Sequence, residues 1–226
     1  MTWQKEEFYE FILENNVVGF FTEPLKLKSG RISPWYVNWR NIAEDVYLID
    51  KLSDYLIKYV RNLGLKPDCF YGVPEGATKL SIITQYKWAK IQQNYESGVY
   101  SLSMGRGKPK DHGDPKDKYF LGIPKGNVII IEDVTTTGSS LIDTINKLSE
   151  VGTQIIAAIG LTNRDEIRDD QKSVEELIRE KGIKYYAMSN AIDLLPIAYD
   201  KLKPGREVAE SIEEYFKKYG IKEIIL

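Results

Sequence analysis

Apolar and polar residues follow two different periods along this chain. Nearly continuous apolar runs, VIII at 128–131 and IIAAIGL at 155–161, indicate strands that are covered on both faces of a sheet. Between them, apolar residues recur at helical spacing in SSLIDTINKLSEVG, which ends at Gly152. This alternation predicts an α/β fold, a doubly wound and mostly parallel sheet flanked by helices.

The same patterns assign the remaining elements. Residues 20–42 combine alternation, a Ser-Gly turn and many aromatic residues, which favours a small irregular strand pair. The predicted helices are 3–13, 46–64, 75–91, 139–152, 172–182 and 205–220. The predicted strands of the sheet are 68–73, 98–104, 127–133, 154–163 and 184–189.

The size of the chain favours one domain. A chain of 226 residues with 42% hydrophobic and 28% charged residues can bury a full core, and no linker divides it. We therefore expect residues 1–226 to form a single domain. Its expected parts are an N-terminal helix and small hood over about 1–45, an α/β core over about 46–204, and a C-terminal helix over about 205–226.

Charge and cysteine content narrow the possible partners and compartments. A net charge of -2 gives no global attraction to nucleic acid or to an anionic membrane. No apolar run approaches the roughly 20 residues that span a bilayer. The single Cys69 lies in an apolar run, and the first residues carry acids where a signal peptide would be basic. These features predict a cytoplasmic protein.

One segment breaks the regular alternation. Residues 105–126, GRGKPKDHGDPKDKYFLGIPKG, are rich in glycine, proline and charge, and they are too many for an ordinary connection. A loop of this kind inside a compact domain is either disordered or functional, and its clustered cations favour a function. His112, the only histidine of the chain, lies in this loop between Asp111 and Gly113. Its neighbours are polar and offer no apolar surface for packing, which favours a functional role over a structural one.

The stretch EDVTTTGSS, residues 132–140, predicts an anion site at the end of a strand. The five hydroxyls and the free amides that enter the next helix at Leu141 would surround a phosphate monoester, and Gly138 would let the backbone approach it. A single Ser or Thr serving as the helix N-cap is the alternative, but one cap needs only one hydroxyl. Neither a Walker A loop nor a dinucleotide-binding pattern is present.

Two carboxylates directly precede this anion site. Glu132 and Asp133 would repel a phosphate, yet carboxylates accept hydrogen bonds from sugar hydroxyls and stabilise a developing positive charge. A sugar phosphate satisfies both halves of the stretch, with its ring hydroxyls at the acids and its phosphate among the hydroxyl side chains.

These residues also resemble a known family. VIIIEDVTTTGSS, residues 128–140, resembles the phosphoribosyl pyrophosphate motif of type I phosphoribosyltransferases. Two stretches are similar to orotate phosphoribosyltransferases in particular: LKSGRISPWYVN at 27–38 to their base-binding segment, and RGKPKDHGD at 106–114 to their mobile catalytic loop. With GLTNR at 160–164, the resemblance spans most of the chain.

The resemblance implies a reaction and an assembly. It implies the type I phosphoribosyltransferase fold and Mg²⁺-dependent transfer of a phosphoribosyl group from 5-phosphoribosyl 1-pyrophosphate (PRPP) to orotate, giving orotidine 5'-monophosphate for pyrimidine synthesis. The magnesium ion would be held mainly by substrate and water, without dedicated protein ligands. It also implies a homodimer in which loop 105–124 reaches the neighbouring active site.

The resemblance and the local chemistry assign candidate site residues. The expected catalytic residues are Lys110, His112 and Asp133. The expected PRPP-binding residues are Arg106, Lys108, Lys110, His112, Glu132, Asp133, Val134, Thr135, Thr136, Thr137, Gly138, Ser139 and Ser140. The expected orotate-binding residues are Lys28, Trp35, Tyr36, Thr136 and Arg164. Arg164 would clamp the orotate carboxylate, while Trp35 and Tyr36 either stack on the pyrimidine or belong to the core.

Two departures from the family pattern concern the pyrophosphate. Where the catalytic loop of the family commonly has Arg-Lys, this chain has Arg106-Gly107, so Lys108 is the candidate replacement. Where many members have Tyr-Lys, this chain has Glu75 and Gly76, and Lys79 is expected to be an ordinary helix residue.

Two other functions stay open at this stage. One is a phosphoribosyltransferase for another nucleobase, which an anionic clamp at Arg164 and Lys28 disfavours. The other is a non-catalytic regulator that senses PRPP, which would need a nucleic-acid surface that the sequence does not indicate.

Overall fold

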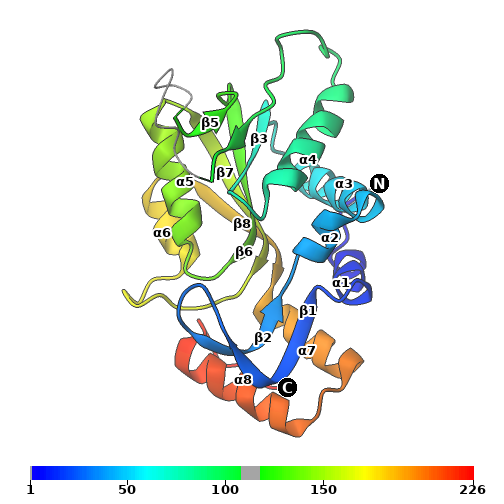
Figure 1. Ribbon diagram of the computed structural model, residues 1–226, viewed down its shortest axis with the longest axis vertical. Helices are drawn as coiled ribbons and strands as arrows, with labels where there is room; N and C mark the ends of the chain where they lie inside the picture. Colours follow the sequence, from blue (N-terminus) through cyan, green and yellow to red (C-terminus); the bar gives the residue numbers. More distant parts are fainter. Residues whose placement is uncertain (1, 108–117) are drawn as a thin grey trace.

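The central layer of the protein is a four-stranded parallel sheet. A computed structural model describes residues 2–107 and 118–226 (Figure 1). The strands lie in the order β3, β6, β7, β8. Their bounds are Cys69–Gly72 for β3, Asn127–Thr135 for β6, Gln154–Asn163 for β7 and Lys184–Asn190 for β8. The prediction of a mostly parallel α/β sheet is therefore confirmed.

Helices cover both faces of this sheet. Successive strand residues point to opposite sides, so a continuous apolar strand presents apolar side chains on both faces. Phe70 and Ile129 face one apolar core, and Tyr71 and Ile130 face the other. The first core is closed mainly by α1 (Lys5–Glu14), α3 (Val46–Asn62), α4 (Thr78–Lys90) and α7 (Ala191–Leu202). The second is closed by α5 (Ser139–Glu150) and α6 (Val174–Glu180). The apolar runs are thus buried on both sides, as their continuous hydrophobicity predicts.

A small antiparallel hood lies beyond one end of the sheet. It consists of β1 (Val18–Lys26) and β2 (Ile32–Val37), followed by the short helix α2 (Arg40–Glu44) that leads into the core. The hood packs on α8 (Arg206–Tyr219), where Trp35 of β2 stacks on Phe216 with ring centres 6.1 Å apart (Figure 1). The indole nitrogen of Trp39 donates to the Thr162 hydroxyl of β7 at 3.1 Å and so joins the hood to the sheet.

The helices begin in different ways, and the difference bears on ligand binding. The Asp45 carboxylate caps α3 by accepting from the Leu48 amide at 2.9 Å, and Ser173 and Glu176 form a capping box at α6. Helix α5 begins after Gly138, which has a φ of 70° and provides no side-chain cap. The first amides of α5 are therefore available to an anion.

Some predicted elements are wrong or missing. The predicted strand 98–104 is wrong: only β4 (Met104–Gly105) forms, pairing with β5 (Phe120–Leu121), while Val99 and Leu102 are 43% and 57% exposed. Its alternating pattern resembles a strand, but none of the described strands pairs with those residues. Helix α7 was not predicted, because Pro196 lies inside it and it follows β8 without a loop. Helix α2 is too short for periodicity to reveal it.

Candidate active site

A cavity of about 340 Å³ opens at the carboxyl end of β6, where ligands collect in parallel sheets. The hood contributes Lys28 and Tyr36, and Arg164 comes from the position directly after β7. Residues 73–76 close another side of the cavity. From β6 and the loop that follows it come Glu132, Asp133, Val134, Thr136, Thr137, Gly138, Ser139 and Ser140. The acid pair (Glu132 and Asp133), the hydroxyl loop (residues 136–140) and the base-binding candidates other than Trp35 thus surround one space.

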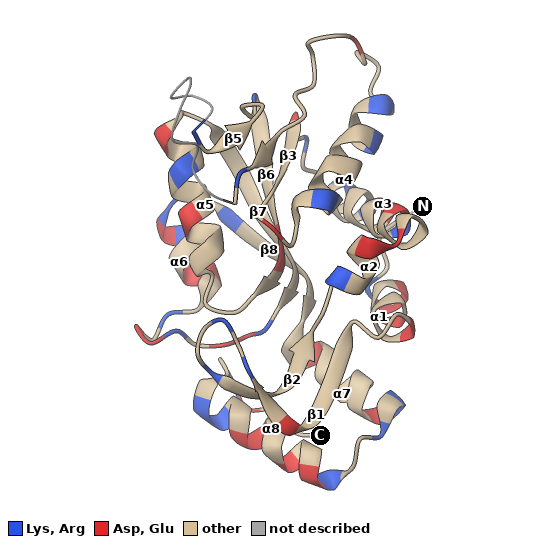
Figure 2. Ribbon diagram, in the orientation of Figure 1, with Lys and Arg blue, Asp and Glu red and all other residues tan. Residues whose placement is uncertain are grey.

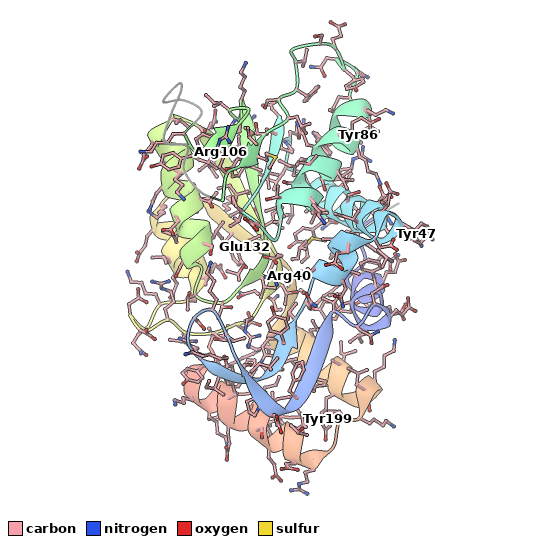
Figure 3. All side chains as sticks on the ribbon, in the orientation of Figure 1. Arg40, Tyr47, Tyr86, Arg106, Glu132 and Tyr199 are labelled. Carbon is pink, nitrogen blue, oxygen red and sulfur yellow. The ribbon has the colours of Figure 1, made fainter. Side chains whose placement is uncertain are left out.

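The two acids differ in their surroundings. Glu132 is 6% exposed, and one of its carboxylate oxygens has no hydrogen-bond partner among the described residues. Burial and the neighbouring Asp133 raise the pKa of Glu132 to about 8, although Lys28 acts in the opposite direction. Burial also raises the pKa of Asp133, opposed by hydrogen bonds from backbone amides and by the charges of Arg40 and Lys28. Figure 3 shows Glu132 on the sheet and Arg40 beside it, at the start of α2.

The hydroxyl loop has the geometry of an anion site. The Thr137 and Ser139 hydroxyls lie 3.1 Å apart, and neither caps α5. A Cβ atom on Gly138 would come within 2.9 Å of a Val174 methyl group, so a side chain there would meet both strain and a clash. The alternative in which one Ser or Thr of this loop serves only as the helix N-cap is therefore not the arrangement found.

Basic side chains gather in an adjoining cavity of about 720 Å³. Lys28 lines both cavities, and its ammonium group donates to the Ser140 hydroxyl at 3.1 Å, which links the hood to the hydroxyl loop. The cations that line the adjoining cavity are Lys28, Arg40, Lys79, Arg106 and Lys147. Lys79 also donates to the Ala43 carbonyl at 3.1 Å, near the end of α2. Three carboxylates, Glu44, Glu75 and Asp143, line the same cavity, but the cations outnumber them, so this side of the site is suited to a polyanion.

The turn after β3, residues 73–76, packs closely against the carboxylate of Asp133. The peptide bond between Pro74 and Glu75 is cis, and Gly76 follows it. A Cβ atom on Gly76 would lie 2.2 Å from a carboxylate oxygen of Asp133. A residue with any side chain would therefore displace the carboxylate, so glycine is required for the observed position of Asp133.

Arg164 lines the cavity and is only 1% exposed. Its Nε donates to Glu166 at 2.6 Å, and one Nη donates to the Ser33 hydroxyl at 2.8 Å. Its guanidinium carbon stands 3.7 Å from the centre of the Trp35 ring. The guanidinium is therefore held in one orientation at the wall of the cavity.

Known proteins resemble this chain over almost its whole length. The orotate phosphoribosyltransferase of Agathobacter rectalis is 31% identical, with 96% of this chain and 98% of the relative covered. That of Lachnoclostridium phytofermentans is 30% identical, covering 98% and 100%. The chain belongs to the orotate phosphoribosyltransferase family. No protein-family model matches it.

Solved structures of this family share the fold. The crystal structure of the Francisella tularensis orotate phosphoribosyltransferase matches with a TM-score of 0.66 and 24% identity, covering 95% of this chain and 99% of that one. The type I phosphoribosyltransferase fold predicted from the sequence is confirmed.

Most of the predicted site residues that the structure describes line the two cavities, but two do not. Trp35 is fully buried between Arg164 and Phe216, so it belongs to the core and supports Arg164 from behind. Thr135 is also fully buried, with its hydroxyl toward Gly160, because its side chain points to the opposite side of β6 from Thr136. A direct ligand contact of either side chain does not fit these positions.

Three expected loop residues lie outside the described residues: Lys108, Lys110 and His112. Arg106, just before them, lines the adjoining cavity (Figure 3).

Sequence reasoning missed several residues that line or support the cavity. Arg40, the first residue of α2, lines both cavities and favours the charged form of Asp133. Arg168 donates to the Thr137 carbonyl and so supports the hydroxyl loop. The three polar residues in Asn-Trp-Arg-Asn, directly after the strand ISPWYV, were the only available signal for Arg40.

Proposed function

We propose that the protein transfers the phosphoribosyl group from PRPP to orotate and forms orotidine 5'-monophosphate and pyrophosphate. Membership of the orotate phosphoribosyltransferase family supports this reaction. The observation that carries the proposal at the level of residues is the single cavity that brings together the acid pair, the hydroxyl loop and the Arg164 guanidinium.

The sugar phosphate would occupy the β6 end of the cavity. The hydroxyl loop and the uncapped amides of α5 would hold the 5'-phosphate, and Glu132 and Asp133 would accept from the ribose hydroxyls. As the bond to pyrophosphate breaks, the anomeric carbon becomes positively charged. A nearby ionised Asp133 would stabilise that charge in a site from which water is largely excluded.

The leaving group would occupy the adjoining cavity. Arg40, Arg106 and Lys28 line it and would balance the charge of the pyrophosphate. Lys108, Lys110 and His112 are proposed to complete this set, with His112 or Lys110 donating a proton or hydrogen bond to the departing oxygen. Gly76 and Gly107 stand where many members of the family have a lysine, so Arg40 would balance a larger share of the pyrophosphate charge.

The base would lie between the hood and the end of β7. Arg164 would pair with the orotate carboxylate, Lys28 and Thr136 would contact the ring substituents, and Tyr36 would face the ring. A carboxylate is the one group that distinguishes orotate from uracil, so this contact would set the choice between these two bases.

The acid pair also suits a Mg²⁺ ion held mainly by substrate and water. No group of three or more His, Cys, Asp or Glu residues in the described part of the chain could hold a metal, whereas Glu132 has a buried oxygen without a partner. The ion would neutralise charge on the pyrophosphate as it leaves. Removing it with a chelator should stop turnover, and added Mg²⁺ should restore it.

A non-catalytic regulator that senses PRPP would need a basic surface for nucleic acid, and the described part of the chain does not support one. Figure 2 shows Lys and Arg interspersed with Asp and Glu on the helices of the described part rather than gathered in a basic stripe. A phosphoribosyltransferase for another base would leave the buried cation of Arg164 without a partner of opposite charge on its ligand.

The test is an assay with PRPP, Mg²⁺ and a panel of orotate, uracil, hypoxanthine and adenine. Base consumption and pyrophosphate release are measured together. We expect turnover of orotate alone. Turnover of another base while orotate is inert would reject the substrate, and binding of PRPP without any turnover would reject an enzymatic function.

Arg40→Gln is expected to raise the KM for PRPP about tenfold, because one charge-assisted contact to the leaving group is lost. Arg40 also lowers the pKa of Asp133, which burial raises, so its removal raises that pKa further. The acid limb of kcat/KM for PRPP should therefore move to higher pH. Arg206→Gln on the exposed face of α8 is the matched control. An unmoved acid limb would reject the coupling to Asp133.

The proposal includes a homodimer in which loop 105–124 reaches the neighbouring site, as the resemblance implies. Val46 and Tyr47 of α3 and Tyr86 of α4 are exposed apolar side chains that are compatible with such an interface. Figure 3 labels Tyr47 and Tyr86. Light scattering should give twice the 26.0 kDa mass of the chain, and a monomer would reject the assembly.

A cytoplasmic location is also proposed. The single Cys69 is buried as a free thiol, which suits a reducing compartment. No helix in the described ranges is long and apolar enough to cross a membrane. Recovery of the protein outside the cytoplasmic fraction of its native cells would contradict this location.

A further inference from the structure

A buried carboxylate lies directly behind the proposed base site. Glu166, two residues after Arg164, is 1% exposed. It accepts hydrogen bonds from Arg164 Nε at 2.6 Å, from Arg31 Nη1 at 2.7 Å and from the Tyr215 hydroxyl at 2.9 Å. These donors come from the end of β7, the hood and α8, so one carboxylate joins three separate parts of the fold.

This arrangement fixes the rotamer of Arg164. Its Nε is bound to Glu166, and its Nη2 donates to the Ser33 hydroxyl at 2.8 Å and to the Tyr215 hydroxyl at 3.5 Å. Its flat face lies on Trp35. Among the described residues, none accepts a hydrogen bond from Nη1. Since Arg164 lines the cavity, Nη1 is the donor left for a ligand.

Arg31 connects the same carboxylate to the base-binding segment of the hood. It lies in the turn that carries Lys28, is 8% exposed, and donates through Nη2 to the Ile167 carbonyl at 2.6 Å. Its guanidinium carbon is 4.6 Å from the centre of the Tyr219 ring on α8. Glu166 therefore sets the position of the turn as well as that of Arg164.

The cluster carries an excess of positive charge. Two buried guanidinium groups face one carboxylate, and Tyr215 remains a neutral donor because burial raises its pKa to about 12. Asp169 lies 3.5 Å from Arg31, but its side chain is fully exposed, so water screens it. A buried cation without a counter-ion is costly, and a carboxylate on the ligand would supply that counter-ion.

We propose that Glu166 is a positioning residue for base recognition: by holding Arg164 and Arg31 it aims Arg164 Nη1 into the cavity and makes the site selective for a base that carries a carboxylate. The inference rests on the proposed transfer to orotate and deepens it. Glu166 itself makes no contact with the substrate.

Glu166→Gln and Tyr215→Phe test this role. The first removes the negative charge, and the second removes only the hydroxyl that donates to Glu166 while it keeps the packed ring. Glu175→Gln, in an exposed pair with Arg179, is the matched control. Arg164→Lys keeps a charge beside Glu166 but loses the planar guanidinium. Its KM for orotate shows how much is lost when Arg164 itself is replaced, and the other variants are compared with it.

We expect the KM for orotate to rise about tenfold or more in Glu166→Gln and about threefold in Tyr215→Phe, with the KM for PRPP within about twofold of wild type. Melting temperatures are measured in parallel, since loss of a buried charge also lowers stability. An unchanged orotate KM in Tyr215→Phe, or equal increases in the two KM values, would show a purely structural role and overturn the inference.

The measurements distinguish a failure of the proposed Glu166 role from a failure of the proposed reaction. Should Glu166→Gln fail to fold, the orotate KM of Tyr215→Phe decides, because that variant retains the charge cluster. If the wild-type protein does not turn over orotate at all, the proposed function fails before the variants are compared.

Discussion

Gly76→Ala is expected to lower kcat/KM for PRPP about 100-fold while the melting temperature stays close to that of wild type. The new methyl group would lie 2.2 Å from Asp133 Oδ2 and 2.7 Å from Oδ1, so the carboxylate must move. A side-chain end moves at little cost to folding. A displacement of about 1 Å in a catalytic group, however, costs on the order of 100-fold in rate.

Steady-state kinetics with varied PRPP, together with thermal melting, measure this effect. Gly19→Ala is the control, because a methyl group there meets only the Phe21 ring at an ordinary 3.5 Å. Activity near the wild-type value in Gly76→Ala would mean that the position of Asp133 does not limit the reaction.

The second large effect expected concerns stability and pH. Burial holds the pKa of Glu132 at about 8, above its ordinary 4.5, so the folded state binds this proton more tightly than the unfolded state. The stability that this group provides is present at low pH and is lost as the pH rises from 4.5 through about 8. Glu132→Gln, which resembles the protonated form, should therefore be the more stable protein at pH 9, by up to about 5 kcal/mol.

The free energy of unfolding, measured without substrate or Mg²⁺ at several pH values, tests this expectation. The difference between Glu132→Gln and wild type should vanish near pH 4. The variant should also turn over more slowly, because it loses an acceptor for the ribose hydroxyls. A difference that does not depend on pH would show that folding leaves the pKa of Glu132 unchanged.

The sequence predicted the sheet better than its surroundings. The strands β6 and β7 are continuous apolar runs, and the helix between them has clear periodicity, so local pattern was enough. It was not enough for α7, where Pro196 interrupts the pattern, or for residues 98–104, where alternation occurs without a pairing strand. Partners in a sheet are chosen by the whole fold, and a local pattern does not contain that information.

The sequence likewise revealed some residues of the candidate site and not others. The hydroxyl loop and the acid pair stand together in nine consecutive residues, so their chemistry was visible. The contacts of Glu166 join residues 135 and 49 positions away, and no spacing rule reveals them. Trp35 was ambiguous for a related reason: an aromatic residue in a strand has two faces available, and only the packing of α8 determines which one is buried.

The packing of α8 against the hood also has a consequence for biosynthesis. The chain makes the hood early, yet Tyr215 and Phe216, which support Arg164 and Trp35 there, are made much later. A nascent chain that has already folded its sheet and hydroxyl loop would still lack the α8 side chains that hold Arg164 and Trp35 in the proposed base site. Competence to select a base would therefore arise only when residues 206–219 have left the ribosome and docked.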